Sequence, residues 1–411
     1  MNEFALGMGP KLFSFTKGET TYSLRLLPIG GYCAMEGEDA ESDNPRAFNN
    51  AKIWKRMIII VAGAFMNIVL GLVLMFFTLL PQDVYNSTTV GAFDPCSFTA
   101  STGLQEGDKI VEINDYNIYS STDFSFAMYT LPISEVDGTT LEIYKEDCLF
   151  YLRDHYALVS QGLKQEELEK IYTIWSEGGR KIVESNDREA AYAFMCEYID
   201  KINDELQIDR VEAYPEIDVK DTRQRYRTSM TVMRDGEKVL LSQVDFFTYK
   251  NTEDGEAALA IDFYVEPIEK TFLSTLQQTG IQTVSVVRMV WGGLVGLVKG
   301  EFGINDVAGP VGLASAITDV ASESLKSSFL DAVMSIVYVM MVITVNLGIV
   351  NMLPFPALDG GRFLMLLFEA IFRRSLPRKV EGIINGIGLG LLLLLMAVIT
   401  FKDIWVLIFG G

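Results

Sequence analysis

One short segment carries the residue types best suited to chemistry in this chain. Residues 351–361 read Asn-Met-Leu-Pro-Phe-Pro-Ala-Leu-Asp-Gly-Gly and close a long run without charge. The carboxylate therefore falls at membrane depth, where an ionisable group is costly and by default marks a functional site. A lone aspartate would be interpreted as a polar helix end at the membrane surface. The residues around it favour a site built from Asn351, Pro354, Asp359, Gly360 and Gly361.

The elements that hold this segment are predicted to cross a membrane. Three runs carry no charge, residues 57–80, 332–358 and 382–401. About 20 apolar residues cross a hydrocarbon core of about 30 Å. Buried helices of a soluble protein are the alternative, and three such runs in one chain disfavour it. We predict spans over 57–80, 332–358 and 382–408, the second leading into Asp359.

A fourth apolar stretch, residues 272–298 within the element predicted over residues 268–300, is of a different kind. It is interrupted by Arg288 and carries Gln277, Gln278 and Gln282. A charge and several amides along one apolar helix are typical of a helix that lies in the membrane surface. We therefore predict an amphipathic surface helix over this stretch.

Basic residues predict the orientation, because short cytoplasmic loops are enriched in Lys and Arg. One cluster precedes the first predicted span, and it consists of Lys52, Lys55 and Arg56. A second cluster separates the last two spans, and it consists of Arg362, Arg373, Arg374, Arg378 and Lys379. With both clusters in the cytoplasm, residues 82–332 and the C-terminus are extracytoplasmic. No apolar stretch precedes residue 57, so no signal peptide is predicted.

Composition narrows the class of protein. The chain has 411 residues, a net charge of -20 and 49% hydrophobic residues. So acidic a chain is not expected to bind nucleic acid. Strong charge beside high hydrophobicity predicts separate membrane and aqueous parts. The four cysteines form no C-x-x-C pair, so a cysteine zinc site is unsupported. One disulfide is possible among the three extracytoplasmic cysteines, Cys96, Cys148 and Cys196, whereas Cys33 belongs to the cytoplasmic segment.

The aqueous parts comprise a cytoplasmic segment and an interrupted domain. Residues 1–56 predict short strands with turns ahead of the first span. Residues 86–136 contain the run Gly-Leu-x-x-Gly-Asp-x-Ile-x-x-Ile-Asn. Residues 227–266 contain a hairpin with an Asp-Gly turn at Asp235. The two parts look like the halves of a bacterial PDZ domain.

Residues 137–226 separate these halves and are strongly acidic. From residue 135 to 225 there are 22 acidic and 12 basic residues. Residues 161–175 and 188–206 show helical periodicity. A solvated helical insertion is the plainer interpretation, and a recognition subdomain facing the cell exterior is the alternative.

Taken in order, these pieces resemble the bacterial site-2 proteases, zinc intramembrane metalloproteases with a PDZ domain. The likeness rests on the strand loop of residues 2–32, the first span with Gly63 and Asn67, the Gly309-Pro310-Val311 segment and the Asp-Gly-Gly segment. It implies a polytopic α-helical membrane protein with an extracytoplasmic α/β PDZ domain that carries a helical insertion. Three spans are present where the family has four. Asn67 is an amide at membrane depth, so it is expected to face another helix.

The resemblance also implies a zinc site. In the family, two histidines of an H-E-x-x-H helix and the aspartate matched by Asp359 hold zinc, and the glutamate is the general base. It gives site-shaping roles to Asn351, Pro354, Gly360, Gly361, Gly63 and Asn67. This chain departs from the pattern because it has one histidine and no H-E-x-x-H. That histidine, His155, is predicted to be a surface residue beside Asp154 in the acidic insertion. The chain as it stands is therefore expected to bind no zinc and to be inactive alone.

The H-E-x-x-H helix of the family lies immediately before the strand loop, and here Met1 opens that loop. We expect the natural protein to begin some tens of residues earlier and to include this helix. The alternative is a genuine product without it, a catalytically inactive membrane scaffold that binds peptides through its PDZ domain. A transporter is disfavoured because no duplicated spans are present.

The implied partners are transmembrane segments of other proteins, such as anti-sigma factors or signal-peptide remnants, in the bacterial cytoplasmic membrane. A helical substrate must unwind before its backbone can be cut. The strand loop at residues 11–27 is expected to offer an edge strand to it. The PDZ domain is expected to admit substrates only after their ectodomains have been trimmed.

Overall fold

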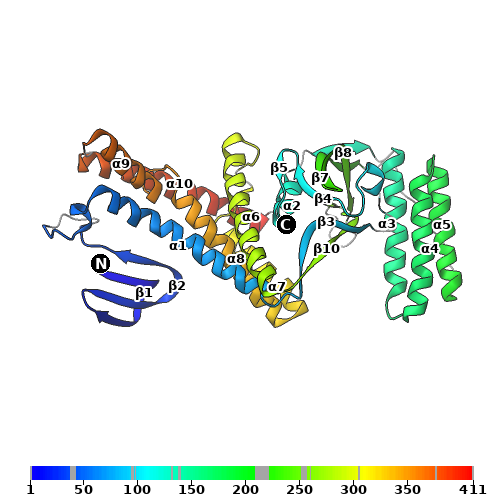
Figure 1. Cartoon of the computed structure of the whole chain (residues 1–411), viewed down its shortest axis with the longest axis horizontal. Coiled ribbons are helices and arrows are strands. Elements are labelled where there is room, and N and C mark those ends of the chain that lie inside the picture. The colour runs from blue at the N-terminus through cyan, green and yellow to red at the C-terminus, as the bar shows by residue number, and fades with distance from the viewer. Residues whose placement is uncertain are drawn as a thin grey trace. The chain divides into compact units, whose positions relative to one another are not determined.

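The computed structural model (Figure 1) describes residues 2–37, 43–93, 97, 99–130, 133–137, 140–208, 222–250, 257–259, 261–303, 306–374 and 377–409. The chain forms two compact units. We name Met1–Thr78 with Val290–Gly411 the membrane unit, and Leu79–Met289 the aqueous unit.

Four helices among the described residues are long and apolar enough to cross a membrane. They are α1 (Ile53–Leu79), α6 (Phe272–Lys299), α8 (Phe329–Asn351) and residues Lys379–Phe409 of α10 (Arg378–Phe409). In the most apolar stretch of each of α1, α8 and α10, at most 17% is buried. Their apolar side chains therefore need lipid around them, as in a multi-pass membrane protein. The sequence predicts α6 to be a surface helix, whereas its length and composition also fit a span.

The predicted span over residues 332–358 is divided in the structure. α8 ends at Asn351, and a separate helix, α9 (Asp359–Phe372), follows the link. Pro354 and Pro356 lie in that link. A proline lacks the N–H that a helix needs, and its ring clashes with the preceding turn. The carboxylate therefore begins a helix of its own.

A curled two-stranded sheet precedes α1. It consists of β1 (Glu3–Lys17) and β2 (Thr20–Ala34). Residues 11–17 pair with the start of β2, whereas residues 3–6 lie opposite both the start and the end of β2. One side of residues 11–17 therefore stays at the edge of this sheet.

The aqueous unit contains an eight-stranded sheet in the order β10-β3-β4-β7-β8-β9, with β5 beside β4 and β6 beside β7. The strands are β3 (Val84–Phe93), β4 (Lys109–Ile113), β5 (Tyr116–Asn117), β6 (Ile133–Asp137), β7 (Thr222–Arg234), β8 (Glu237–Lys250), β9 (Ala257–Leu259) and β10 (Phe263–Glu269). Helix α2 (Ser121–Tyr129) packs on it, and the buried core includes Val90, Ile110, Met230, Val244 and Phe246.

The sheet joins the two sequence segments that look like halves of one domain. Ile113 of β4 pairs with Met230 of β7. The fully buried carboxylate of Asp108 accepts hydrogen bonds from Nε and Nη2 of Arg234, both at 2.7 Å. A buried carboxylate needs such a paired donor. The Gly-Asp run and the Asp-Gly hairpin are thus held together by the backbone pairing of β4 with β7 and by the ion pair between Asp108 and Arg234.

The acidic insertion is shorter than the sequence predicts. β6 pairs with β7 from Ile133 opposite Tyr226 to Asp137 opposite Thr222. Asp137 and residues 222–226 therefore belong to the sheet, because their backbone groups continue its ladder. Part of the predicted insertion, residues 209–221, lies outside the described residues.

The insertion is a three-helix bundle with its own core (Figure 1). Its helices are α3 (Leu141–Ser160), α4 (Gln165–Glu184) and α5 (Arg188–Leu206). The side chain of Asp187 caps α5 by accepting from the N–H of Ala190 at 2.7 Å. The sequence predicts helices at α4 and α5, whereas α3 carries too many charges among its apolar positions for its periodicity to stand out.

His155 lies in this bundle, partly buried, where a surface residue is predicted. Its Nε2 shares a hydrogen bond of 2.8 Å with Oδ1 of Asn203, a fully buried side chain of α5. Burial raises the pKa of the Cys148 thiol in the same core. Cys148 and Cys196 are free thiols, and Cys96 lies outside the described residues.

Because the bundle has a separate core, we expect it to unfold separately. Ile171 is fully buried there. Replacing it by alanine should cost about 2–5 kcal/mol, the usual loss for a buried Ile. Hydrogen exchange by mass spectrometry should then show faster exchange in α3, α4 and α5 alone. Leu158→Ala is the control, since that side chain is 70% exposed. Equal acceleration in the sheet would contradict this independence.

Candidate active site

Helices α1 and α8 approach closely through small residues. A Cβ added to Gly348 would lie 2.9 Å from the carbonyl oxygen of Ala64 and 3.2 Å from Cβ of Asn67. One turn further along α1, a Cβ on Gly71 would overlap the side chain of Val345. Small residues allow such close contact between membrane helices. Asn67 thus faces a neighbouring helix, as an amide at this depth requires.

The link between α8 and α9 places the carboxylate. Ala357 has a positive φ of 73°, and its N–H donates to Oδ1 of Asn385 in α10 at 3.3 Å. A Cβ on Gly388, also in α10, would overlap the backbone of Pro356. The link is therefore fixed on α10 by a hydrogen bond and by close packing. A non-glycine residue in this left-handed region is uncommon and is held there by its surroundings.

The glycine pair is required by this tight link. A Cβ on Gly360 would overlap the carbonyl oxygens of Met352 and Leu353, and one on Gly361 would overlap that of Phe355. These neighbours are backbone atoms and cannot rotate away. The two glycines therefore allow α9 to start directly against the link.

Asp359 is the first residue of α9 and is partly buried. The start of a helix carries partial positive charge, which favours a carboxylate. A Cβ on Gly63 of α1 would lie 3.9 Å from its Oδ2. Helix α1 thus meets, at Asp359, the link and α9, which follow one another directly and lie far from α1 in the sequence.

The predicted site residues divide into two groups. The structure brings Gly63, Asp359, Gly360 and Gly361 together, and it places Asn67 one turn further along α1. Asn351 is the last residue of α8, and Pro354 is exposed in the link.

The residues present do not form a zinc site by themselves. Catalytic zinc takes three protein ligands and a water. Within the described part of the chain, no group of three or more His, Cys, Asp or Glu side chains could hold a metal. The single histidine, His155, is hydrogen-bonded inside the helical bundle. Asp359 is therefore a single candidate zinc ligand, and the described residues around it do not supply the other two.

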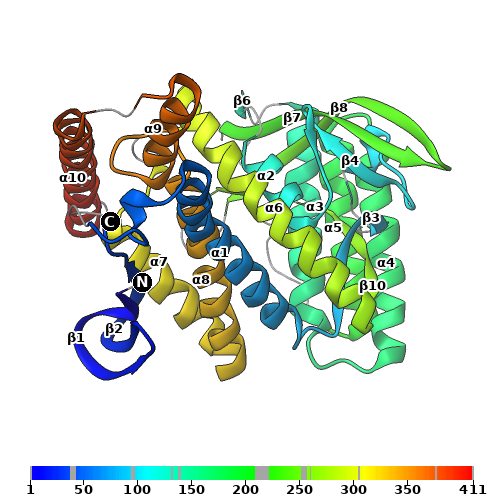
Figure 2. The same ribbon diagram turned by 60° about the vertical axis from the view of Figure 1, so that its left-hand side comes forward.

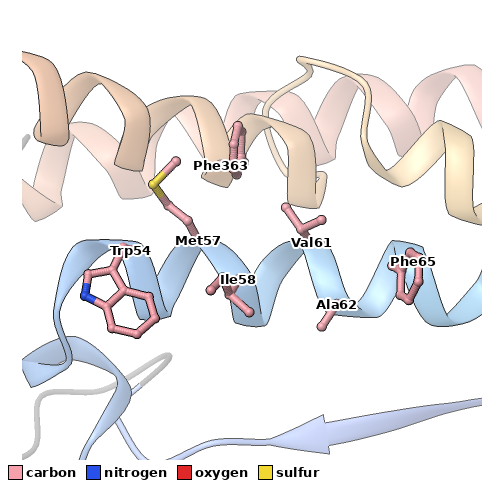
Figure 3. Close-up of a pocket in the computed structure, with 7 residues that line it drawn as sticks. All are labelled: Trp54, Met57, Ile58, Val61, Ala62, Phe65 and Phe363. Atoms are coloured by element: carbon pink, nitrogen blue, oxygen red, sulfur yellow. The ribbon is translucent and has the colours of Figure 1, made fainter.

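An apolar groove of about 500 Å³ runs along α1 beside this site (Figure 3). It is lined by six residues of α1 between Trp54 and Phe65 and by Phe363 of α9. The lining carries no ionisable side chain, so the groove offers apolar contact and no catalytic group.

A buried carboxylate of α10 escaped the sequence analysis. Oδ2 of Asp403 in α10 accepts from the N–H of Gly309 at 2.9 Å and of Gly312 at 2.8 Å. Nζ of Lys402 donates to the carbonyl oxygen of Val307 at 2.8 Å. These contacts satisfy the start of α7 (Pro310–Ser327), whose first N–H groups have no partner within the helix. The sequence did offer one signal for a site at Asp403, namely the charged pair Lys402-Asp403 directly after the uncharged run of residues 382–401.

Replacing Asp403 by alanine should loosen the start of α7. Two N–H groups lose their acceptor, and an unsatisfied buried donor is costly. We expect a lower melting temperature in detergent and new protease cleavage near residue 309. Asp319→Ala is the matched control, because Asp319 is exposed on the same helix. Identical melting of the two variants would show that the contact contributes nothing.

Comparison with known proteins shows the family to which the chain belongs. The sequence model of peptidase family M50 matches residues 1–395. The chain is 29% identical over 439 residues to the regulator of sigma-W protease RasP of Bacillus subtilis, covering 98% of this chain and 90% of that protein. It is 27% identical over 417 residues to the zinc metalloprotease RasP of Geobacillus kaustophilus, with the same coverage of 98% and 90%. Zinc is therefore the expected cofactor, and the chain belongs to peptidase family M50, the site-2 protease family.

Proposed function

We propose that this protein works as an intramembrane zinc metalloprotease that cleaves transmembrane segments of other membrane proteins. The observation that carries the proposal is the position of Asp359. Gly360 and Gly361 let the start of α9 pack closely against the link, which places Asp359 next to Gly63 among helices that need lipid around them. A polar helix end without function would need neither the glycines nor the close approach of α1.

Asp359 serves as one zinc ligand in this proposal. The single histidine is engaged in the helical bundle, and the described residues hold no group of three or more potential ligands, so Asp359 does not complete the site by itself. A bound zinc lowers the pKa of its water to about 7, which supplies a nucleophile at neutral pH. Asn351 and Pro354 border the site, and Gly360 and Gly361 fix the ligand's position.

The curled β1–β2 sheet is the proposed docking place for an unwound substrate. Residues 11–17 form an edge, and their side chains include the exposed apolar residues Leu12, Phe13 and Phe15. An extended peptide can add to such an edge through backbone hydrogen bonds. An exposed apolar edge is otherwise a liability that proteins cover.

The substrates we propose are single transmembrane helices of regulatory proteins or signal-peptide remnants. Support comes from the name of the Bacillus subtilis relative, a regulator of sigma-W protease. The sheet of the aqueous unit serves as a PDZ-type peptide-binding domain, supported by the Gly-Asp run joined to the Asp-Gly hairpin through Asp108 and Arg234. By the positions of the basic clusters, this domain is extracytoplasmic.

A catalytically inactive scaffold is the second candidate. It is favoured by the incomplete set of zinc ligands among the described residues. An inactive scaffold would bind peptides through the aqueous unit and would have no use for Asp359.

Cleavage in proteoliposomes distinguishes the two. A tagged transmembrane helix is incorporated together with the protein, expressed either as these 411 residues or with its natural upstream coding sequence retained. We expect cleavage and bound zinc only in the second form, and a zinc chelator should abolish the cleavage. Peptide binding without cleavage in both forms would support the scaffold. Zinc bound at one equivalent by the 411 residues alone would contradict the ligand assignment.

A further inference from the structure

The groove along α1 follows one face of that helix (Figure 3). Its residues on α1 recur every three or four positions, and they are Trp54, Met57, Ile58, Val61, Ala62 and Phe65. At about 3.6 residues per turn, this spacing places all of them on one side of the helix. Each residue turns the helix by about 100°, so Gly63 lies on the opposite side, about half a turn away. Gly63 is the residue of α1 next to Asp359, so the groove and the candidate zinc ligand lie on different sides of α1.

Helix α8 packs along another face of α1 (Figure 2). A Cβ on Gly348 of α8 would lie against Ala64 and Asn67 of α1, and neither of these residues lines the groove. A segment that supplied further zinc ligands beside Asp359 would approach α1 from the side of Gly63. The groove therefore stays open to a different occupant.

The length of the groove fits one leaflet of a bilayer. From Trp54 to Phe65 a helix rises about 16 Å, at about 1.5 Å per residue. Half of a hydrocarbon core of about 30 Å is about 15 Å thick. The transmembrane helix of a partner would contact α1 through both leaflets, whereas the acyl chain of a lipid ends near the midplane. The groove therefore matches the tail of a lipid better than it matches a spanning helix.

The lining of the groove is suited to an acyl chain. It carries no ionisable side chain, and Trp54, Ile58 and Phe65 are 56%, 59% and 59% exposed. Apolar surface of this kind needs a cover of lipid or protein. Phe363 of α9 forms the opposite wall of the groove. A chain lying there is contacted by two helices, whereas a lipid on the outer face of a single helix is contacted by one.

Two lysines lie at the end of the groove where α1 begins. Lys52 precedes the helix, Lys55 lies in its first turn, and both are exposed. The Lys55 amine is 5.6 Å from the centroid of the Trp54 ring, the first residue of the groove, whereas Arg56 is paired with Glu369 at 3.4 Å. The first turn of α1 contains no acidic residue, and the free N–H groups of a helix start add partial positive charge. This end of the groove therefore favours a negatively charged group.

We propose that the groove binds one anionic phospholipid of the cytoplasmic leaflet. One acyl chain lies between α1 and Phe363 of α9, and the headgroup phosphate contacts Lys52 and Lys55. The basic clusters place this end of α1 in the cytoplasm, and the cytoplasmic leaflet carries the anionic lipids. Trp54 lies at the boundary between headgroup and acyl chain, where Trp side chains are enriched. The site requires neither zinc nor Asp359, so it is independent of the proposed cleavage.

Native mass spectrometry of the whole chain in detergent measures this binding. The protein is titrated with phosphatidylglycerol or with phosphatidylcholine of the same acyl chains, and the lipids bound per chain are counted. We expect one phosphatidylglycerol to stay bound at collision energies that remove phosphatidylcholine. Lys52→Gln combined with Lys55→Gln should weaken the binding of phosphatidylglycerol by about 30-fold. Arg373→Gln combined with Arg374→Gln is the control, since it removes two exposed cations of the other basic cluster.

A second variant tests the apolar part of the site. Ala62→Trp places a large side chain in the groove, so the retained lipid should be lost while the helical content stays unchanged. Ala397→Trp is the matched control, because Ala397 is exposed on α10 and does not line the groove. This control should bind phosphatidylglycerol as the wild type does.

Several outcomes would overturn the proposal. Equal retention of the two lipids would show apolar contact without a headgroup site, and full retention by Ala62→Trp would place the lipid elsewhere. A dimer of the wild type that Ala62→Trp dissociates would show that a second copy covers the groove. Loss of the lipid in protein expressed with its natural upstream coding sequence would show that the upstream segment fills the groove.

Discussion

Replacing Asp359 by asparagine should reduce cleavage of a transmembrane substrate by at least about 100-fold. Residues that only hydrogen-bond to a metal ligand already contribute about 10–100-fold to metal affinity or activity, and a ligand itself should contribute more. Asparagine keeps the size of the side chain and removes the charge that a zinc ligand supplies. The measurement is the rate of product formation in proteoliposomes, with the natural upstream coding sequence retained. Zinc content measured on the same samples should fall in parallel.

Asp319→Asn is the matched control, since it removes an exposed carboxylate from another helix of the same unit. Membrane insertion and expression should be equal in the wild type and both variants. Undiminished cleavage by Asp359→Asn would remove this residue from the zinc site.

Replacing Gly360 by alanine should have the second-largest effect. The added Cβ overlaps the carbonyl oxygens of Met352 and Leu353, so the link must move and take Asp359 with it. A displacement of about 1 Å at a catalytic group can cost about 100-fold in rate. We expect cleavage to fall by roughly that factor, while the helical content measured by circular dichroism stays unchanged.

Gly390→Ala provides the control for this substitution. A Cβ there meets no atom within 4 Å, and alanine favours a helix over glycine by about 1 kcal/mol. This variant should be as active as the wild type and at least as stable. If Gly360→Ala also retained full activity, the link would be free to adjust, and the glycine pair would have no part in positioning the carboxylate.

Several features could be predicted from local sequence alone. Uncharged runs of 20 residues or more have one stable environment, so α1, α8 and α10 were predictable from length and composition. The Asp-Gly turn at Asp235 follows from backbone preference, and Asp235 indeed has a positive φ of 52°. The Asp-Gly-Gly segment marked Asp359 because a carboxylate at that depth is costly.

Other features depend on contacts between distant segments. No local pattern indicates that Asp403 holds the start of α7, that Asn385 holds Ala357, or that His155 is bound by Asn203. Each joins groups far apart in sequence, and a hydrogen bond leaves no mark on the residues between its partners. The bounds of the insertion were likewise set by the pairing of β6 with β7.

The sequence by itself determined the membrane class of this protein, its family and its candidate zinc ligand, because hydrophobic length and a short motif are local properties. Tertiary structure alone decided that Gly63 lies against that ligand and that the Gly-Asp run meets Arg234. It also decided that Arg288 of α6 is paired with Asp123, a buried residue of α2. The physical reason is that burial and pairing are properties of the packed chain, since each requires a second segment whose position no single stretch of residues specifies.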